Sequence, residues 1–252
     1  MGAIPLEQWT DRIEKVVASD GDILRRAIVI RETASTQDTA RRGGARLGDV
    51  VVAWRQTAGR GRLGRKWADT QEDGVAMSLV IPAGPPERLA LALAVGVAHA
   101  AQQLLDQPVG IKWPNDIVVD HRKLAGILVE QSGALAIAGI GMNVTQTTWP
   151  RELADRAVSL AQLGVPVDRL DAIVAILASL CTALRLPDDA LAEAFAERDT
   201  LSGTEVTLQN GGETVHGTVL RIDPFDGLLV RTSSGEVHLP AATTSILSHT
   251  LR

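Results

Sequence analysis

The sequence lacks tyrosine altogether and contains only one cysteine and two phenylalanines among its 252 residues. Because a disulfide needs two thiols, the single cysteine excludes an internal disulfide and fits a reducing compartment. Cys181 lies in an apolar run with Leu177, Leu180 and Leu184 at helical spacing, which favours a buried structural thiol over a nucleophile. The five histidines are scattered along the chain, without the spacing of a metal site. Thiol catalysis and a histidine metal centre are therefore disfavoured.

The sequence is also short of positive charge and of long apolar runs. Its 25 basic and 30 acidic residues give a net charge of −5, which argues against a protein that coats nucleic acid. The N-terminus has no basic stretch followed by an apolar core, so no signal peptide is predicted. The longest apolar run, Leu89–Ala98, is well short of the roughly 20 residues that span a bilayer. These absences predict a soluble cytoplasmic protein that binds neither DNA nor a membrane.

Apolar periodicity and turn signals predict an α+β architecture, in which a mixed or antiparallel sheet is backed by helices. Ser35 and Asp38 resemble a capping box for a helix from Thr36 to about Arg46, which ends at the Gly43-Gly44 region or shortly after. The expected strands are Ile28–Ile30, Val50–Trp54, Val75–Ile81, Ile111–Trp113, Ile117–Val119, Lys123–Glu130 and Ala134–Gly141, the last three forming an antiparallel meander. The other expected helices are Pro5–Val17, about Glu87 to Leu105, Asp168–Leu184 and Asp188–Arg198.

The sequence pattern changes after Thr200, where short apolar segments alternate with glycine-containing turns. The expected strands here are Val206–Leu208, Val215–Ile222, Leu228–Arg231 and Val237–Leu239. About 50 residues of this kind suggest a small β-barrel. We therefore expect two domains, a larger one over residues 1–199 and a small barrel over residues 200–252.

The most informative segment is the nine-residue run Gly59–Trp67, GRGRLGRKW, with four cations and three glycines. Glycine lets a backbone turn sharply and bring N–H groups close to a ligand. The planar fork of arginine matches carboxylate and phosphate oxygens. No Gly-Lys-Ser/Thr follows, so the run is not a Walker loop. A solvated basic loop or a nucleic-acid patch is the alternative, but regular Gly-Arg alternation in an acidic protein favours an anion-binding cradle, with Trp67 as a platform for a purine ring.

The same run closely resembles the signature GRGRxGRxW of the biotin–protein ligase family. Three further segments are similar to that family's other signatures, in the same order and at suitable spacings: KWPND (Lys112–Asp116), KLAGILVE (Lys123–Glu130) and GIGMNV (Gly139–Val144). The specific resemblance runs from about Glu32 to Val144 and continues more weakly through a C-terminal SH3-like domain. It implies the class II synthetase-like fold of biotin and lipoate ligases, in a short form without an N-terminal DNA-binding domain.

The resemblance implies roles for individual residues. The implied biotin site comprises Ser35, Thr36, Gln37, Gln56, Gly59, Arg60, Gly61, Arg62, Lys123 and Gly126. The implied ATP and adenylate site comprises Arg62, Arg65, Lys66, Trp67, Lys112, Asn115, Asp116, Lys123 and Asn143. The expected catalytic residues are Arg60, Arg62, Lys123 and Asp116, and no protein ligand of a metal is assigned. Gln37 departs from the family, which usually has asparagine there, so its amide lies one methylene farther from the backbone.

Several of these residues have a structural alternative on local grounds. Ser35 caps a helix as readily as it contacts a ligand, and both roles are compatible because a helix N-terminus favours anions. Asn115 and Asp116 suit a turn after proline. Lys112 and Lys123 suit a surface position, although Lys123 begins an otherwise apolar strand, which favours a packed stem and a directed ammonium. Gly126 indicates close approach of a ligand or of another backbone.

The resemblance implies a two-step reaction, in which biotin and Mg-ATP form biotinyl-5′-AMP and pyrophosphate, and a lysine of a biotin carboxyl carrier domain then takes the biotin. ATP and biotin are thus expected substrates, with Mg²⁺ accompanying ATP. The rival hypotheses are a lipoate or octanoate transferase on the related fold and a biotin-sensing DNA-binding repressor. A homodimer is compatible with pairing of the apolar strand Ala134–Ile140, which a buried strand explains equally well. The small barrel either helps to close the site or only supports stability.

Overall fold

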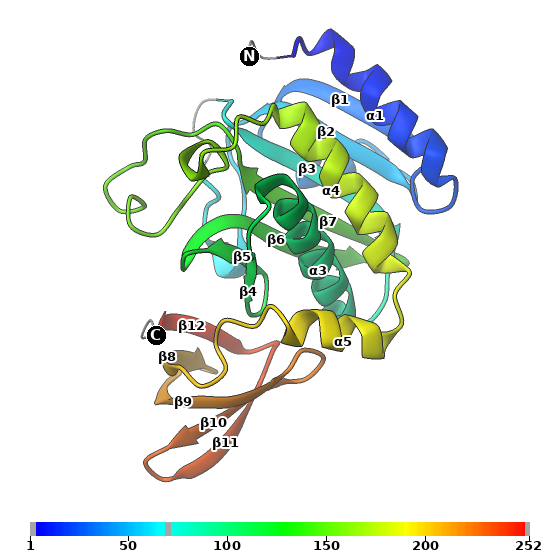
Figure 1. The fold of residues 1–252 in the computed structure, drawn as a ribbon. Helices are drawn as coiled ribbons and strands as arrows, with labels where there is room; N and C mark the ends of the chain where they lie inside the picture. The colour runs from blue at the N-terminus through cyan, green and yellow to red at the C-terminus, as the bar shows by residue number, and fades with distance from the viewer. Residues whose placement is uncertain (1–3, 69–71, 250–252) are drawn as a thin grey trace.

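The computed structural model describes residues 4–68 and 72–249, and a seven-stranded mixed sheet forms its centre (Figure 1). The strands lie in the order β1-β2-β3-β7-β6-β5-β4, in which β1 and β2 are parallel and the other neighbours antiparallel. Their bounds are β1 Arg26–Thr33, β2 Asp49–Gln56, β3 Gly74–Pro82, β4 Gly110–Lys112, β5 Asp116–Val119, β6 Arg122–Ser132 and β7 Leu135–Asn143. The expected α+β sheet and its β5-β6-β7 meander are confirmed.

Different helices pack on the two faces of this sheet. Neighbouring side chains of a strand point to opposite faces, so β2 shows which helices these are. Val50 and Val52 of β2 pack into the main core with α1, α3 and α4, whereas Val51 between them packs with Ala40 of α2 on the opposite face. The helices are α1 Glu7–Asp20, α2 Thr36–Arg42, α3 Pro86–Leu105, α4 Arg169–Leu184 and α5 Asp188–Ala196. Figure 1 shows α1, α4 and α3 side by side over one face. The short α2 leaves much of the other face uncovered by helix.

The uncovered part of that face carries small residues. In strand register Gly139 of β7 faces Ser78 of β3, and Gly141 pairs with Gly126 of β6. Gly139 and Gly141 lie two and four residues after Ile137, which packs against α2, so they lie on the same face of the sheet as α2. Small side chains at neighbouring positions leave room above the strands, and this is where the candidate site lies.

Helix α3 is long and apolar enough to cross a membrane by length and composition alone, but 67% of its most apolar window is buried inside the protein. It packs along α4, where a Cβ at Gly96 would lie 3.0 Å from a side-chain carbon of Leu180. The absence of a side chain at Gly96 therefore lets the two helices approach closely. Cys181 of α4 is buried, and burial, helped by Asp20, raises the pKa of its thiol to about 12. The prediction of a structural thiol agrees with this setting.

The structure decides three local expectations. Helix α2 ends at Arg42, directly before the Gly43-Gly44 region and not as late as Arg46, because the N–H of Gly43 closes the helix on the Thr39 carbonyl. Ser35 has the extended backbone of an N-cap, but its side chain makes no capping bond. Strand β7 lies between β3 and β6 and is hydrogen-bonded on both sides, so it has no free edge for pairing with a second copy. The buried-strand alternative is the right one.

Residues after α5 form a second sheet of five antiparallel strands in the order β11-β10-β9-β8-β12. Their bounds are β8 Glu205–Asn210, β9 Glu213–Asp223, β10 Gly227–Thr232, β11 Gly235–Pro240 and β12 Thr244–His249. The first four correspond to expected strands, while β12 was not expected. In Figure 1 this sheet lies against β4 and α5, and its buried Val206 and Leu208 belong to the same apolar core as the larger sheet. The division into domains at residue 199 or 200 stays a prediction.

Candidate active site

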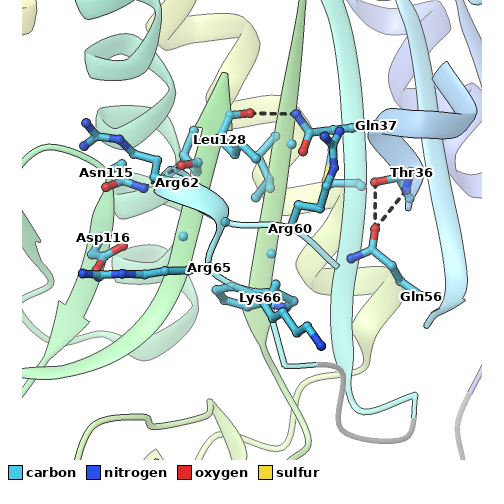
Figure 2. A pocket seen from close by; sticks show the side chains of 18 of the residues that line it. Thr36, Gln37, Gln56, Arg60, Arg62, Arg65, Lys66, Asn115, Asp116 and Leu128 are labelled. Atoms are coloured by element: carbon cyan, nitrogen blue, oxygen red, sulfur yellow. Dashed lines mark hydrogen bonds between the residues drawn. The ribbon is translucent and has the colours of Figure 1, made fainter. Parts of the chain in front are cut away.

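The Gly-Arg run forms a small hairpin that lies over the small residues of the sheet. The N–H of Gly61 donates to the carbonyl of Arg65 (2.7 Å), and the N–H of Trp67 donates to the carbonyl of Gly59 (2.9 Å). A short 3-10 turn, η1 at Arg62–Gly64, closes it. We refer to Gly59–Trp67 as the hairpin. Figure 2 shows its cations diverging, with Arg60 extending towards Gln37, Arg62 towards Asn115 and Arg65 towards Asp116. The hairpin therefore delivers positive charge to several parts of the site.

The ring of Trp67 lies against the paired glycines of β6 and β7. A Cβ added to Gly141 would lie 2.5 Å from Cε2 of Trp67, and one added to Gly126 would lie 3.0 Å from its Cζ3. The ammonium of Lys123 lies 5.3 Å from the ring centroid, a cation–π distance. Trp67 is thus wedged between the sheet and Lys123. The close approach expected at Gly126 is real, but a tryptophan and a lysine side chain make it.

Replacing Gly141 by alanine is expected to displace Trp67 and to lower the free energy of unfolding by about 1–3 kcal/mol, since a methyl group would overpack the ring. Urea unfolding followed by circular dichroism measures this change. Gly84→Ala is the matched control, because a Cβ at Gly84 meets only ordinary contact with Leu89 at 4.0 Å. A Gly141→Ala protein as stable as the Gly84→Ala protein would contradict the wedged position of Trp67.

A first cavity opens beside the hairpin and has a wall of neutral polar groups. Oε1 of Gln56 accepts hydrogen bonds from the N–H (2.9 Å) and hydroxyl (3.3 Å) of Thr36, whose oxygen accepts a bond from Ser78 (2.8 Å). Nε2 of Gln37 donates to the carbonyls of Leu128 (3.2 Å) and Ile137 (3.4 Å), as Figure 2 shows for Leu128. All three site residues, Thr36, Gln37 and Gln56, are buried. A buried wall of amides and hydroxyls suits a neutral ligand that both donates and accepts hydrogen bonds.

The extra methylene of Gln37 has a visible consequence. Its amide carbon and Oε1 lie so close to Gly139 that a Cβ there would be 2.7 Å away. The side chain therefore crosses above β7, and its NH₂ group is used by the carbonyls of the sheet. Ser35 and Gly59, two further expected biotin contacts, are not among the described residues that line this cavity. Ser35 is nonetheless buried, next to Thr36 in the sequence.

A β-bulge directs Lys123 into the site. Register between β5 and β6 shifts so that Leu124 has no partner on β5, and Leu124 points into the main core. An extra residue reverses the alternation of side chains, which places Lys123 on the same face as Gly126. Backbone bonds hold it there, from its N–H to the Arg156 carbonyl (2.7 Å) and from the Val158 N–H to its own carbonyl (3.0 Å). The sequence expectation of a directed ammonium is physically explained by this bulge.

The ammonium of Lys123 pairs with Asp116 at 2.6 Å. The side chains of Lys123 and Asp116 are 35% and 29% exposed, so water screens the pair in part and it contributes little to global stability. Lys112 lies near this pair, and burial lowers the pKa of its ammonium, opposed by the nearby Asp116. Burial likewise lowers the pKa of Arg62, with Asp116 opposing. Several cations thus converge on one carboxylate, which leaves a surplus of positive charge for an anionic ligand.

Two expected ligand contacts, Asn115 and Asn143, use their amide groups within the protein. Nδ2 of Asn115 donates to the carbonyl of Ile127 (2.7 Å), and Nδ2 of Asn143 donates to the carbonyls of Lys123 (3.1 Å) and Val158 (3.0 Å). These bonds tie the ends of the Lys112–Asp116 and Gly139–Val144 segments to β6. In the structure both asparagines therefore support the backbone around Lys123.

Arg60 and Arg62 have different partners. The guanidinium of Arg60 lies between Glu130 and Asp38. The guanidinium of Arg62 donates to the carbonyl of Ala241 (3.4 Å), in the turn between β11 and β12. The second sheet thus contacts the hairpin directly. Glu130 could have been noted as the acidic end of an apolar strand, whereas nothing local to Ala241 indicated this contact.

A second, larger cavity of about 680 Å³ lies beyond the hairpin, within the 300–1,000 Å³ range of small-molecule sites. Its lining adds residues that the sequence reasoning missed, among them Trp149, Arg156, Leu247 and His249. The first and second cavities share five described lining residues, Arg65, Lys66, Trp67, Asp116 and Lys123. The shared wall is therefore built almost wholly from the hairpin and the Lys123–Asp116 pair. Within residues 4–68 and 72–249 no cluster of three His, Cys, Asp or Glu side chains could hold a metal ion.

Comparison with known proteins identifies the family. Residues 28–146 match the Biotin/lipoate A/B protein ligase family. The bifunctional ligase/repressor BirA of Bacillus subtilis (strain 168) is 36% identical over 224 residues, which cover 80% of this chain and 68% of that protein. The biotin–[acetyl-CoA-carboxylase] ligase of Mycobacterium tuberculosis is 34% identical over 257 residues, covering 92% and 95% of the two chains.

A similar solved structure is the biotin protein ligase from Aquifex aeolicus in complex with biotin and ATP. It superposes with a TM-score of 0.79 at 30% identity, over 88% of this chain and 99% of that one. A biotin protein ligase from Leishmania major in complex with biotinyl-5-AMP superposes with a TM-score of 0.61 at 25% identity, over 88% and 98% of the two chains. The chain therefore belongs to the biotin–protein ligase family.

Proposed function

We propose that this protein is an ATP-dependent biotin–protein ligase that forms biotinyl-5′-AMP and transfers the biotin to a lysine of a biotin carboxyl carrier domain. The observation that carries the proposal is the wall shared by the two cavities. A neutral polar cavity suits the ureido ring of biotin, and the larger cavity suits a nucleotide. Their ligands would meet at Lys123, Asp116 and the cations of the hairpin. The relatives named as biotin ligases, and the complex with biotin and ATP, support the same substrates.

The first step places two anions side by side. The carboxylate of biotin is ionised at neutral pH, so it attacks the α-phosphorus of ATP without a general base. Pyrophosphate leaves as the new P–O bond forms. The protein must then offset charge repulsion by fixed cations, and we assign Lys123 and Arg62 to the reacting oxygens. Lys112, Arg65 and Lys66 would face the phosphates, since Arg65, Lys66 and Lys112 line the second cavity.

Mg²⁺ is expected with ATP, where it would supply further charge neutralisation at the phosphates. Because phosphate-bound Mg²⁺ keeps several waters and takes only one or two carboxylates, a dedicated cluster of acidic residues is not required. Asp116 is the carboxylate that lines both cavities, so the described residues fit a cation held mainly by the nucleotide.

The second step is attack of the carrier lysine on the acyl carbon of the adenylate, with AMP as the leaving group. The attacking amine must lose a proton, and we assign Asp116 to receive it. The names of the relatives support a biotin carboxyl carrier domain of a carboxylase as partner. We further propose that the protein acts in the cytoplasm without DNA or membrane partners. A homodimer, if formed, would use a surface other than the interior strand β7.

The proposal predicts biotin-dependent exchange of labelled pyrophosphate into ATP, because formation of the adenylate is reversible on the enzyme. Purified protein, Mg-ATP, biotin and labelled pyrophosphate suffice for the measurement. Exchange should fall to background without biotin and should not appear when lipoate or octanoate replaces it, because one wall of the first cavity carries the buried polar groups of Thr36, Gln37 and Gln56, which suit a ureido ring better than an acyl chain. Absence of exchange with biotin would refute the proposal. Exchange with lipoate or octanoate alone would favour the related transferases.

A further inference from the structure

We propose that Arg60 is a positioning residue, which latches the hairpin to α2 and β6 through Glu130 and Asp38. This inference rests on the proposed function but assigns Arg60 a task different from binding the carboxylate or the phosphate. The latch comprises Arg60, Glu130, Asp38 and Arg41. It would set where the hairpin lies over the first cavity, and hence how long the adenylate is retained.

The geometry of Arg60 is that of a clamp. Its Nη1 lies 3.1 Å from Oε1 of Glu130, and its Nη2 lies 2.6 Å from Oε2 of the same carboxylate. Such a bidentate pair fixes orientation as well as distance. Nη2 also lies 3.1 Å from Oδ1 of Asp38. Both terminal nitrogens of Arg60 are therefore occupied by carboxylate oxygens of the protein.

Charge in the latch is balanced within the protein. Arg41 contacts the same two carboxylates, at 3.2 Å from Asp38 and 3.0 Å from Glu130. Two guanidinium groups thus face two carboxylates, and the cluster has no surplus charge to offer a ligand. The opposite holds around Asp116, where Lys112, Lys123 and Arg62 outnumber the single carboxylate. The anions of the reaction are therefore drawn to that end of the hairpin and away from Arg60.

The latch connects the hairpin to the elements that make the cavity wall. Asp38 follows Gln37 on α2, and Glu130 lies two residues after Leu128 on β6. The side chain of Gln37 donates a hydrogen bond to the carbonyl of Leu128. Arg60 itself lines the first cavity, and its Nε is buried without a hydrogen-bond partner among the described residues. Because the clamp fixes the guanidinium plane, it also fixes where this remaining donor points. Movement of the latch would shift the hairpin and the wall together.

The side chains of the latch are partly exposed, so a purely structural role and a positioning role predict different experimental results. The side chains of Arg60, Glu130 and Asp38 are 35%, 27% and 28% exposed, and pairs of this kind contribute little to global stability. A structural role alone therefore predicts small changes in every measurement. A positioning role predicts a marked change in adenylate retention with an almost unchanged melting temperature.

The test compares Arg60→Gln, Glu130→Gln, the double variant and the control Arg42→Gln, which removes an exposed arginine of α2 outside the latch. We expect Arg60→Gln and Glu130→Gln each to speed release of biotinyl-adenylate by about tenfold, the cost of one charge-assisted pair. The double variant should be no worse than either single variant, because both remove the same interaction. Arg42→Gln should change release by less than about twofold, because its exposed side chain lies outside the latch.

A second readout does not depend on activity. Trypsin cleaves after the hairpin residues Arg62, Arg65 and Lys66, and both single variants should be cut there faster than the ligand-free wild-type protein. Wild-type adenylate retention by Glu130→Gln, with loss in Arg60→Gln, would show that Arg60 binds the anion directly and would overturn the latch. Multiplicative effects in the double variant would overturn it as well. If the wild-type protein made no adenylate, the proposed function would fail, while the trypsin comparison would still decide on the latch.

Discussion

Replacing Lys123 by methionine is expected to slow formation of biotinyl-adenylate by about 100- to 1,000-fold, the usual effect of removing a preorganised electrostatic donor. Lys123 lies in the wall shared by the two cavities, and its ammonium is 2.6 Å from Asp116. Its backbone is held by Asn143 and the segment at Val158. Methionine keeps most of the length of the stem but removes the charge that two approaching anions require. Single-turnover formation of the adenylate measures the loss.

Comparison with Asp116→Asn shows whether the charge of Lys123 or its ion pair with Asp116 is needed for adenylate formation. If Lys123 acts on the anions, Asp116→Asn should leave adenylate formation within about tenfold of wild type and should slow transfer to an amine, since it removes the proposed proton acceptor. Equal losses of adenylate formation in both variants would instead mean that the pair acts as one structural unit. Adenylate formation by Lys123→Met at the wild-type rate would remove Lys123 from the reacting centre.

Arg62→Ala is expected to keep the fold but to release biotinyl-adenylate about 10 to 100 times faster, the equivalent of one or two charge-assisted hydrogen bonds. Arg62 is half-buried between the hairpin and Ala241 of the second sheet. Its guanidinium would therefore lie over the phosphate of the intermediate. Replacement by alanine would expose that phosphate to water. Release is measured by trapping the free adenylate after a single turnover.

The control for Arg62 is Arg42→Ala, which removes an exposed arginine from the last turn of α2. It should leave both the release rate and the unfolding midpoint unchanged. Retention of the adenylate by Arg62→Ala at the wild-type level would exclude Arg62 from the cover and would shift attention to Arg65 and Lys66.

Much of the fold was predictable because its signals are local. The short apolar runs Val75–Ile81 and Lys123–Glu130 predicted strands β3 and β6, and the alanine- and leucine-rich segment after Pro85 and Pro86 predicted α3. Strand β12 escaped because Thr244–His249 has only two apolar residues in six, too few for alternation to stand out. This segment is a strand because it pairs with β8, and its own sequence gives no such signal.

The sequence by itself determined many of the chemical groups of the site, because most of its cations and glycines lie in four compact segments, with Thr36, Gln37 and Gln56 shortly before them. Only the tertiary structure decided which of these groups pair with one another and which face the cavities. The pairing of Arg60 with Glu130 joins residues 70 apart, and that of Arg62 with Ala241 joins residues 179 apart. Such contacts depend on strand register, on the bulge that turns Lys123 onto the face of Gly126, and on where the second sheet packs. No window of neighbouring residues carries that information, since it arises only when the whole core is formed.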